Sequence, residues 1–131
     1  MSYAYGKTSK ERLETCHPEI QKLFNSLIED YDITIICGHR NEADQNKAFN
    51  EGKSGLKFPQ GKHNSLPSLA VDAMLFPIDW NDNGRNYMFA GIVKERARAL
   101  GINLRLGADW DGDISTKDQK FHDLVHFELK L

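Results

Sequence analysis

An aspartate stands in the middle of an otherwise apolar segment, and this feature most strongly limits what the chain can fold into. The segment is residues 69–76, LAVDAMLF, and Pro77 follows it. A short apolar run that ends at a proline is typical of a buried strand. A lone carboxylate inside a protein costs several kcal/mol unless it is paired, hydrogen-bonded or bound to a metal. The fold must therefore bring a compensating group to Asp72.

The rest of the chain alternates between helical and extended patterns. Apolar spacing and β-branched runs predict helices at 8–16, 18–30, 41–51 and 87–100, and strands at 33–37, 104–106 and 124–129. Residues 52–68 are rich in Gly, Ser, Lys, Asn and Pro, and we expect them to form a long loop. This order predicts an α+β fold in which helices pack on a small, mainly antiparallel sheet.

Length and charge limit the classes of protein that this chain can belong to. Its 131 residues, 40% hydrophobic and 27% charged, are expected of one soluble domain spanning residues 1–131. The formal net charge is −2, whereas proteins that bind phosphate backbones are usually basic, so we expect no nucleic-acid partner. No apolar run approaches the roughly 20 residues that span a membrane, and residues 1–12 lack the apolar core of a secretory signal. We expect a monomer that does not insert into a membrane.

Two histidines are candidates for the group that compensates Asp72. His63 lies nine residues before it, and His126 lies in the last predicted strand. Two imidazoles and one carboxylate are a common ligand set for catalytic zinc, which leaves a fourth position for water. Asp123 precedes His126 by three residues, and this spacing can place its carboxylate beside that water as a general base.

Each of these residues also has a purely structural interpretation. Isolated histidines are often structural. Asp72 can instead cap a turn or pair with Arg40, and Asp123 can be a solvated acid in a loop. A His…Asp…His pattern arises by chance in many proteins, so spacing alone leaves both interpretations open.

Four short segments between residues 33 and 129 match the motifs of one enzyme family in the same order. KHNSLPSLAVD at 62–72 matches H-N-x-x-P-S-x-A-V-D, and DLVHFE at 123–128 matches (E/D)-x-x-H-F-E. GHR at 38–40, followed by Gln45, resembles G-Y-R-(S/N)…Q with His in place of Tyr, and GADW at 107–110 resembles the turn G-G-D-W with Ala in place of the second Gly. The chain thus resembles zinc peptidases of the D-alanyl-D-alanine carboxypeptidase/VanY type. Within them it is most similar to phage endolysins that cut the L-alanyl-D-glutamate bond of peptidoglycan stem peptides.

The resemblance implies a zinc centre in a central groove. His63, Asp72 and His126 match the ligands of the Zn²⁺ ion in that family, and Asp123 matches the general base and acid. The base in many relatives is Glu, whose side chain is one methylene longer. The Asp at this position fits the endolysin branch, and it requires the attacking water to lie slightly closer.

Three further positions match the first motif. Arg40 matches the family arginine that polarises the scissile carbonyl or holds the substrate. Gln45 matches a supporting position nearby. His39 replaces the usual aromatic residue before the arginine, where it is either a packing substitute or an additional polar contact.

The expected activity is therefore zinc-dependent hydrolysis of a peptide bond in bacterial peptidoglycan, as an L-alanyl-D-glutamate endopeptidase. A D,D-carboxypeptidase or a D-Ala-D-Ala dipeptidase on the same scaffold is the alternative enzyme. A non-catalytic module that binds wall peptides is the alternative from another class, although such a module has no use for the base Asp123. Without an export signal, the resemblance implies accumulation in the host cytoplasm until the membrane is breached.

Several other residues keep two interpretations. Glu128 shares a strand face with His126 by alternation, so it is either a partner of that ring or a surface acid. Trp80 and Trp110 either line a substrate groove or belong to the core and its rim.

The alternating acids Asp109, Asp111 and Asp113 can bind calcium, but they form a solvated turn in the simpler interpretation. An EF-hand carries a bidentate Glu at its twelfth position, and that position holds Lys120 here. The sequence therefore favours the solvated turn.

Overall fold

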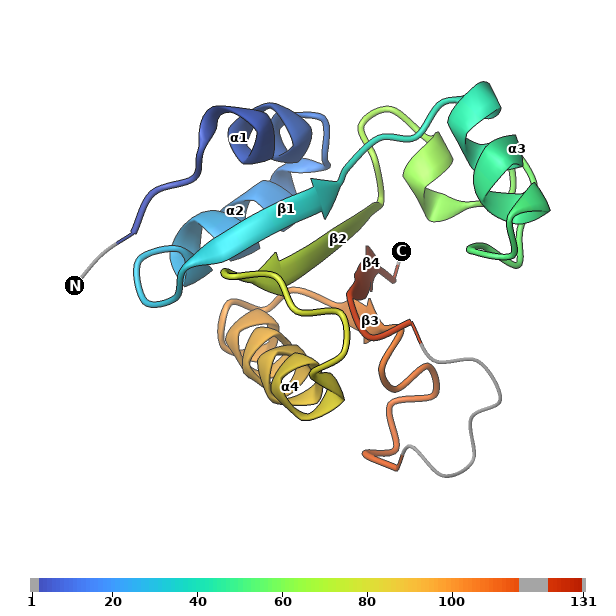
Figure 1. Cartoon of the computed structure of the whole chain (residues 1–131). Helices are drawn as coiled ribbons and strands as arrows, with labels where there is room; N and C mark the ends of the chain where they lie inside the picture. Colours follow the sequence, from blue (N-terminus) through green and yellow to red (C-terminus); the bar gives the residue numbers. More distant parts are fainter. Residues whose placement is uncertain (1–2, 116–122, 131) are drawn as a thin grey trace.

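A computed structural model describes residues 3–115 and 123–130, and their helices and strands follow the predicted order (Figure 1). The helices are α1 (Lys7–Glu14), α2 (Pro18–Leu27), α3 (Glu42–Asn50) and α4 (Asn83–Ala99), with a short 3-10 helix, η1 (Lys62–Asn64). The strands are β1 (Ile33–Cys37), β2 (Ala70–Leu75), β3 (Leu104–Leu106) and β4 (His126–Leu129). The predicted α+β class is confirmed.

The four strands form one antiparallel sheet in the order β1-β2-β4-β3. The central strand β2 contains Asp72, and its register places this residue opposite His126 of β4. On the other side of β2, an irregularity between Ile35 and Cys37 places Cys37 opposite Asp72. An extra residue of this kind bends a strand locally. The sheet register thus brings together two residues that lie far apart in the sequence.

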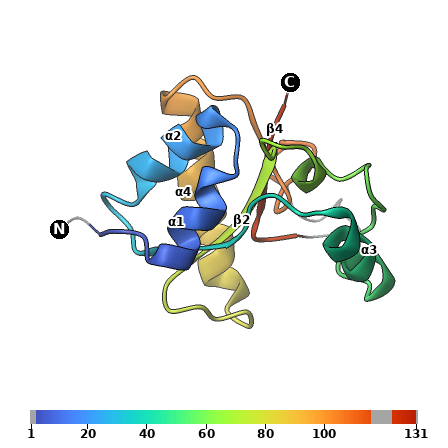
Figure 2. The same cartoon turned by 90° about the horizontal axis from the view of Figure 1, so that it is seen from above.

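The two faces of the sheet have different environments. Helices α1, α2 and α4 lie on one side of it, whereas α3 and η1 lie on the other (Figure 2). Phe127 of β4 points into the helical side, where its ring packs edge-on against the rings of Phe24 and Phe89. The ring centroids are 5.8 Å and 6.0 Å apart, respectively. Because side chains alternate along a strand, His126 and Glu128 point to the opposite face. The hydrophobic core therefore supports the strand whose other face carries polar groups.

Helix α4 begins earlier than predicted. We expected its first residue near Tyr87, but the helix begins at Asn83. The Asp82 carboxylate accepts a hydrogen bond from the Arg85 backbone N–H at 3.0 Å, which satisfies a donor that a helix start leaves unpaired. The polar stretch before Tyr87 thus forms the capped first turn. None of the described helices, α4 included, is both long and apolar enough to cross a membrane.

Candidate active site

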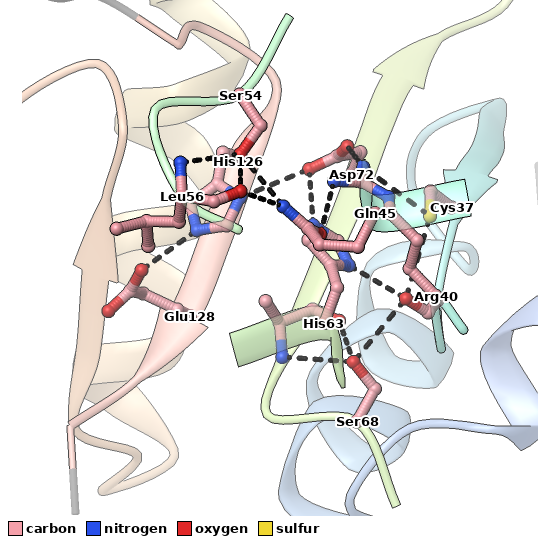
Figure 3. A network of polar contacts seen from close by, with 12 residues as sticks. Cys37, Arg40, Gln45, Ser54, Leu56, His63, Ser68, Asp72, His126 and Glu128 are labelled. Carbon is pink, nitrogen blue, oxygen red and sulfur yellow. Dashed lines mark hydrogen bonds and ion pairs between the residues drawn. The ribbon is translucent and has the colours of Figure 1, made fainter. Parts of the chain in front are cut away.

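The three predicted metal ligands meet on the polar face of the sheet (Figure 3). His63 Nε2 lies 3.1 Å from Asp72 Oδ1, and His126 Nδ1 lies 3.2 Å from the same oxygen. One ligand atom from each residue lies within 4.8 Å of the others. All three residues are buried, with at most 9% of the surface of each exposed. Elements η1, β2 and β4 thus supply the donor set that the sequence predicts.

In each of the two histidines, the ring nitrogen that does not face Asp72 has a polar partner of its own. His63 Nδ1 donates to the Gly38 carbonyl oxygen at 2.7 Å, and His126 Nε2 lies 2.8 Å from Glu128 Oε1. The remaining nitrogen of each ring therefore faces Asp72. Metal-binding histidines are commonly oriented through such a bond from the second ring nitrogen. Two oriented imidazoles and a carboxylate fit the N and O ligands that zinc prefers.

The ionisable groups of the site shift one another's pKa strongly, without any contribution from a metal ion. Burial by itself lowers the pKa of an imidazole, but the Asp72 carboxylate raises the pKa of His63 to about 10. For His126, the hydrogen bonds to Asp72 and Glu128 also outweigh burial and raise the pKa to about 9. Burial raises the pKa of Asp72, yet the two imidazoles hold it well below its usual range. The buried carboxylate is thus compensated by positive charge, which a divalent cation also supplies.

Arg40 lies at the same carboxylate and is held by an amide network. Its Nη2 is 3.5 Å from Asp72 Oδ2, and its Nη1 donates to Gln45 Oε1 at 3.1 Å. Asn64 Nδ2 donates to the same Gln45 oxygen at 3.1 Å and to the Arg40 carbonyl oxygen. The Asp72–Arg40 pair, which the sequence offered as an alternative to metal binding, therefore coexists with the histidine cluster. Sequence reasoning missed Asn64, although its place next to His63 was a signal.

Asp123 faces the same groove from the segment before β4. This groove has a volume of about 1250 Å³, and its lining includes Arg40, His63, Asp72 and His126 together with Asp123. Burial raises the pKa of the Asp123 carboxyl, and the negative charge of Asp72 adds to the effect. A raised pKa makes a carboxylate a better proton acceptor. The structure thus brings Asp123 to the groove that holds the three candidate ligands.

His39 has a different position. Its backbone N–H donates to the Thr15 hydroxyl at 2.8 Å, and its ring Nδ1 lies 3.0 Å from the Ser65 carbonyl oxygen. The described residues that line the groove do not include His39. Of its two interpretations, the structure thus supports an additional polar contact, made between two loops rather than to the space in the groove.

The acids Asp109, Asp111 and Asp113 also lie close together, with one oxygen of each within 4.8 Å of the others. All three carboxylates accept a backbone hydrogen bond inside the same turn: Asp109 from Ile114 N at 2.8 Å, Asp111 from Asp113 N at 3.3 Å, and Asp113 from Ser115 N at 2.8 Å. Lys94 lies 3.9 Å from Asp109. These contacts describe a compact turn in which Asp111 and Asp113 are exposed, as expected of a solvated turn, whereas Asp109 is buried.

Comparisons with known proteins identify the family of this chain. The family model described as phage L-alanyl-D-glutamate peptidase matches residues 1–130. The L-alanyl-D-glutamate peptidase of Escherichia phage T5 is 34% identical over 124 residues, which cover 91% of this chain and 90% of that protein.

A solved structure of another protein has a similar fold. The crystal structure of the Serratia marcescens L-Ala D-Glu endopeptidase ChiX superposes with a TM-score of 0.73 at 22% identity, and the match covers 97% of this chain and 90% of that one. The similarity in sequence and fold thus extends over nearly the whole chain. The chain belongs to the phage L-alanyl-D-glutamate peptidase family, which is the branch that its motifs predict.

Proposed function

We propose that this protein is a zinc peptidase that hydrolyses the L-alanyl-D-glutamate bond in the stem peptides of bacterial peptidoglycan. The observation that carries the proposal is the convergence of His63, Asp72 and His126 in one groove that Asp123 also lines. Membership of the family supports the choice of bond. The combination of three candidate ligands with a separate carboxylate supports a catalyst rather than a binding module.

The roles of the residues follow from their positions. His63, Asp72 and His126 would hold the zinc ion, which when bound supplies a positive charge that polarises an amide carbonyl and acidifies water. Asp123 takes a proton from the attacking water as the new C–O bond forms. It then gives that proton to the amine nitrogen as the C–N bond breaks. Asp123 is therefore the group through which the proton passes.

Arg40 stabilises the negative charge that develops on the carbonyl oxygen. Its guanidinium lies beside Asp72, and the buried Gln45 amide holds one of its nitrogens. A donor that is fixed before the reaction stabilises the transition state without reorganising. Gln45 thus acts by positioning Arg40.

Analysis of the products tests the proposed bond. Purified peptidoglycan digested with the zinc-loaded protein should gain new free L-alanine carboxyl termini and new D-glutamate amino termini. The alternative carboxypeptidase or dipeptidase would instead release D-alanine or its dipeptide. Release of D-alanine without new L-alanine termini would therefore contradict the proposal.

Substitution of Asp123 tests the proton transfer. The variant Asp123→Asn should lose about 10²- to 10⁴-fold in turnover, because an amide cannot accept the proton. Its zinc content should stay at one ion per chain, measured by metal analysis after dialysis. His126→Ala should lose both zinc and activity.

The matched control for this substitution is Asp44→Asn on the exposed side of α3, which should keep both properties. A fully active Asp123→Asn variant would refute the role of the base.

A further inference from the structure

A second cavity opens beside the candidate active site. Its volume is about 420 Å³, and its lining residues are Trp80, Asn83, Asn86, Tyr87, Asp123, Leu124 and Val125. Three of these residues, Trp80, Asp123 and Val125, also line the main groove. The side cavity, as we call it, therefore lies next to the groove at the proposed base. A molecule held in the groove can extend past Asp123 into this space.

The lining of the side cavity is aromatic and amide in character. Trp80, in the connection from β2 to α4 (yellow in Figure 1), leaves 58% of its surface exposed although it borders a cavity. Asn83 and Asn86 on the first turn of α4 add amide groups, and an amide both donates and accepts hydrogen bonds. The described lining contains no Lys or Arg. Aromatic faces with a few amides suit an uncharged ligand that carries both C–H faces and hydroxyl or acetamido groups.

The main groove, in contrast, carries charged side chains of both signs. The cations Arg40, Lys53, Lys62 and Arg105 line it beside the carboxylates Asp72, Asp123 and Glu128, and such cations bind carboxylates through charge-assisted hydrogen bonds. The two ends of the proposed substrate also differ in charge. The D-glutamate end of the stem peptide carries free carboxylates. On the other end, L-alanine is joined by an amide to the lactyl group of N-acetylmuramic acid, and this amide removes the negative charge of the sugar.

The position of the scissile bond makes the sugar a near neighbour of the reaction. The L-alanyl-D-glutamate bond is the first peptide bond after the lactyl amide. Only the alanine and the lactyl group, about 7 Å of chain, separate its carbonyl carbon from the sugar ring. A cavity that begins at the proposed base lies within this reach.

From this geometry we infer that the side cavity is the subsite for the N-acetylmuramyl ring of the glycan strand. Trp80 packs against a face of the sugar, and Asn83 binds its polar substituents, while the buried Asn86, whose Nδ2 donates to the Asp79 carbonyl oxygen at 3.5 Å, forms part of the cavity wall. The carboxylates of the D-glutamate end lie toward the cations of the main groove. This assignment rests on the proposed function, and it makes the enzyme selective for stem peptides that are still attached to the glycan.

Two matched substrates test the subsite. One is the tripeptide L-Ala-D-Glu-L-Lys carrying N-acetylmuramic acid on its amino end, and the other is the same peptide with an N-acetyl group there. The wild-type protein should cleave the muramyl substrate with a kcat/KM about 5- to 10-fold higher. Trp80→Ala should remove this preference by lowering kcat/KM more for the muramyl substrate than for the N-acetyl substrate, because Trp80 lines both the side cavity and the main groove. Asn83→Ala should reduce the preference in the same way.

Phe76→Ala is the matched control, because Phe76 is an exposed aromatic of the same connection that lines neither space. It should keep the full preference for the sugar. Equal cleavage of both substrates by the wild-type protein would overturn the subsite while leaving the peptidase activity in place. An equal loss on both substrates in Trp80→Ala would also overturn it. If the proposed function itself fails, neither substrate is cut at the L-alanyl-D-glutamate bond.

Discussion

Glu128 controls the orientation of one proposed ligand. Its Oε1 holds His126 Nε2, and its Oε2 lies 3.5 Å from Lys62 Nζ and 3.8 Å from Arg105 Nη1. Burial raises the pKa of this carboxyl, but the bond from His126 and the two cations lower it below its usual value. Glu128 is therefore an ionised acceptor at neutral pH. Of its two sequence interpretations, partner of the ring or surface acid, the structure supports the first.

Removal of this charge should weaken zinc binding. Glu128→Gln keeps the size of the side chain but loses the negative charge that orients His126, so zinc affinity should fall about 10- to 100-fold. Competition with a chromophoric chelator measures this affinity without any assay of activity. The control Glu95→Gln removes an exposed acid on α4 and should leave the affinity unchanged. Unchanged affinity in Glu128→Gln would mean that the contact is incidental.

At the scale of elements, the turn after β3 positions the proposed base. Gly107 N donates to the His126 carbonyl oxygen at 2.9 Å, and Asp123 N donates to the Gly107 carbonyl oxygen at 3.1 Å. The two backbones are so close that a Cβ on Gly107 would lie 2.2 Å from the Asp123 carbonyl oxygen. Glycine at this position therefore allows the segment before β4 to pack against the turn, with Asp123 over the groove.

A side chain at this position should displace the base. Gly107→Ala should lower kcat by about 10²-fold, because a shift of about 1 Å in a reacting group has an effect of that size. Measurements of kcat and of bound zinc separate this effect from loss of the metal, and zinc should stay at one ion per chain.

Gly91→Ala on α4 is the matched control, since a Cβ there meets nothing within 4 Å. It should keep full activity and gain about 0.5–1 kcal/mol in the free energy of unfolding. A Gly107→Ala variant with wild-type kcat would show that Asp123 does not depend on this turn.

At the scale of the whole molecule, the candidate metal centre joins segments that are distant in the sequence. His63 of η1, Asp72 of β2 and His126 of β4 belong to the same cluster, and the Asp72–His126 contact spans 54 residues. A ligand that binds only the folded state stabilises it, by about 2.7 kcal/mol when present at 100 times its Kd. A metal held by this cluster would therefore contribute to stability as well as to the proposed catalysis.

Zinc should raise the melting temperature of the metal-free protein. At zinc concentrations of about 100 times the Kd, the expected rise is about 10 °C for a chain of this size. Calorimetry of the protein treated with a chelator, before and after addition of zinc, measures the shift. His63→Ala should show no rise, and neither should the wild-type protein with Mg²⁺, which prefers oxygen ligands. An equal melting temperature with and without zinc would contradict the metal centre.

Local patterns were sufficient for most of the elements. The β-branched run 33–37 coincides with β1, because such residues favour extended backbone and fit a buried sheet. The start of α4 was missed because the stretch around Asp82 has the composition of a turn, and only its hydrogen bond to the Arg85 backbone shows it to be a helix cap. Helix η1 was also missed, since three residues are too few for a helical period to appear.

The sequence by itself determined the chemical types in the site, because a carboxylate inside an apolar strand demands a partner and the motifs contain two imidazoles and a second acid. The tertiary structure decided which groups meet. The antiparallel register of β2 and β4 places Asp72 opposite His126, and the packing of α4 forms the side cavity at Trp80. Such contacts depend on the alignment of distant segments and on the packing of both faces of the sheet. Periodicity reports only on near neighbours in the chain, so it does not contain this information.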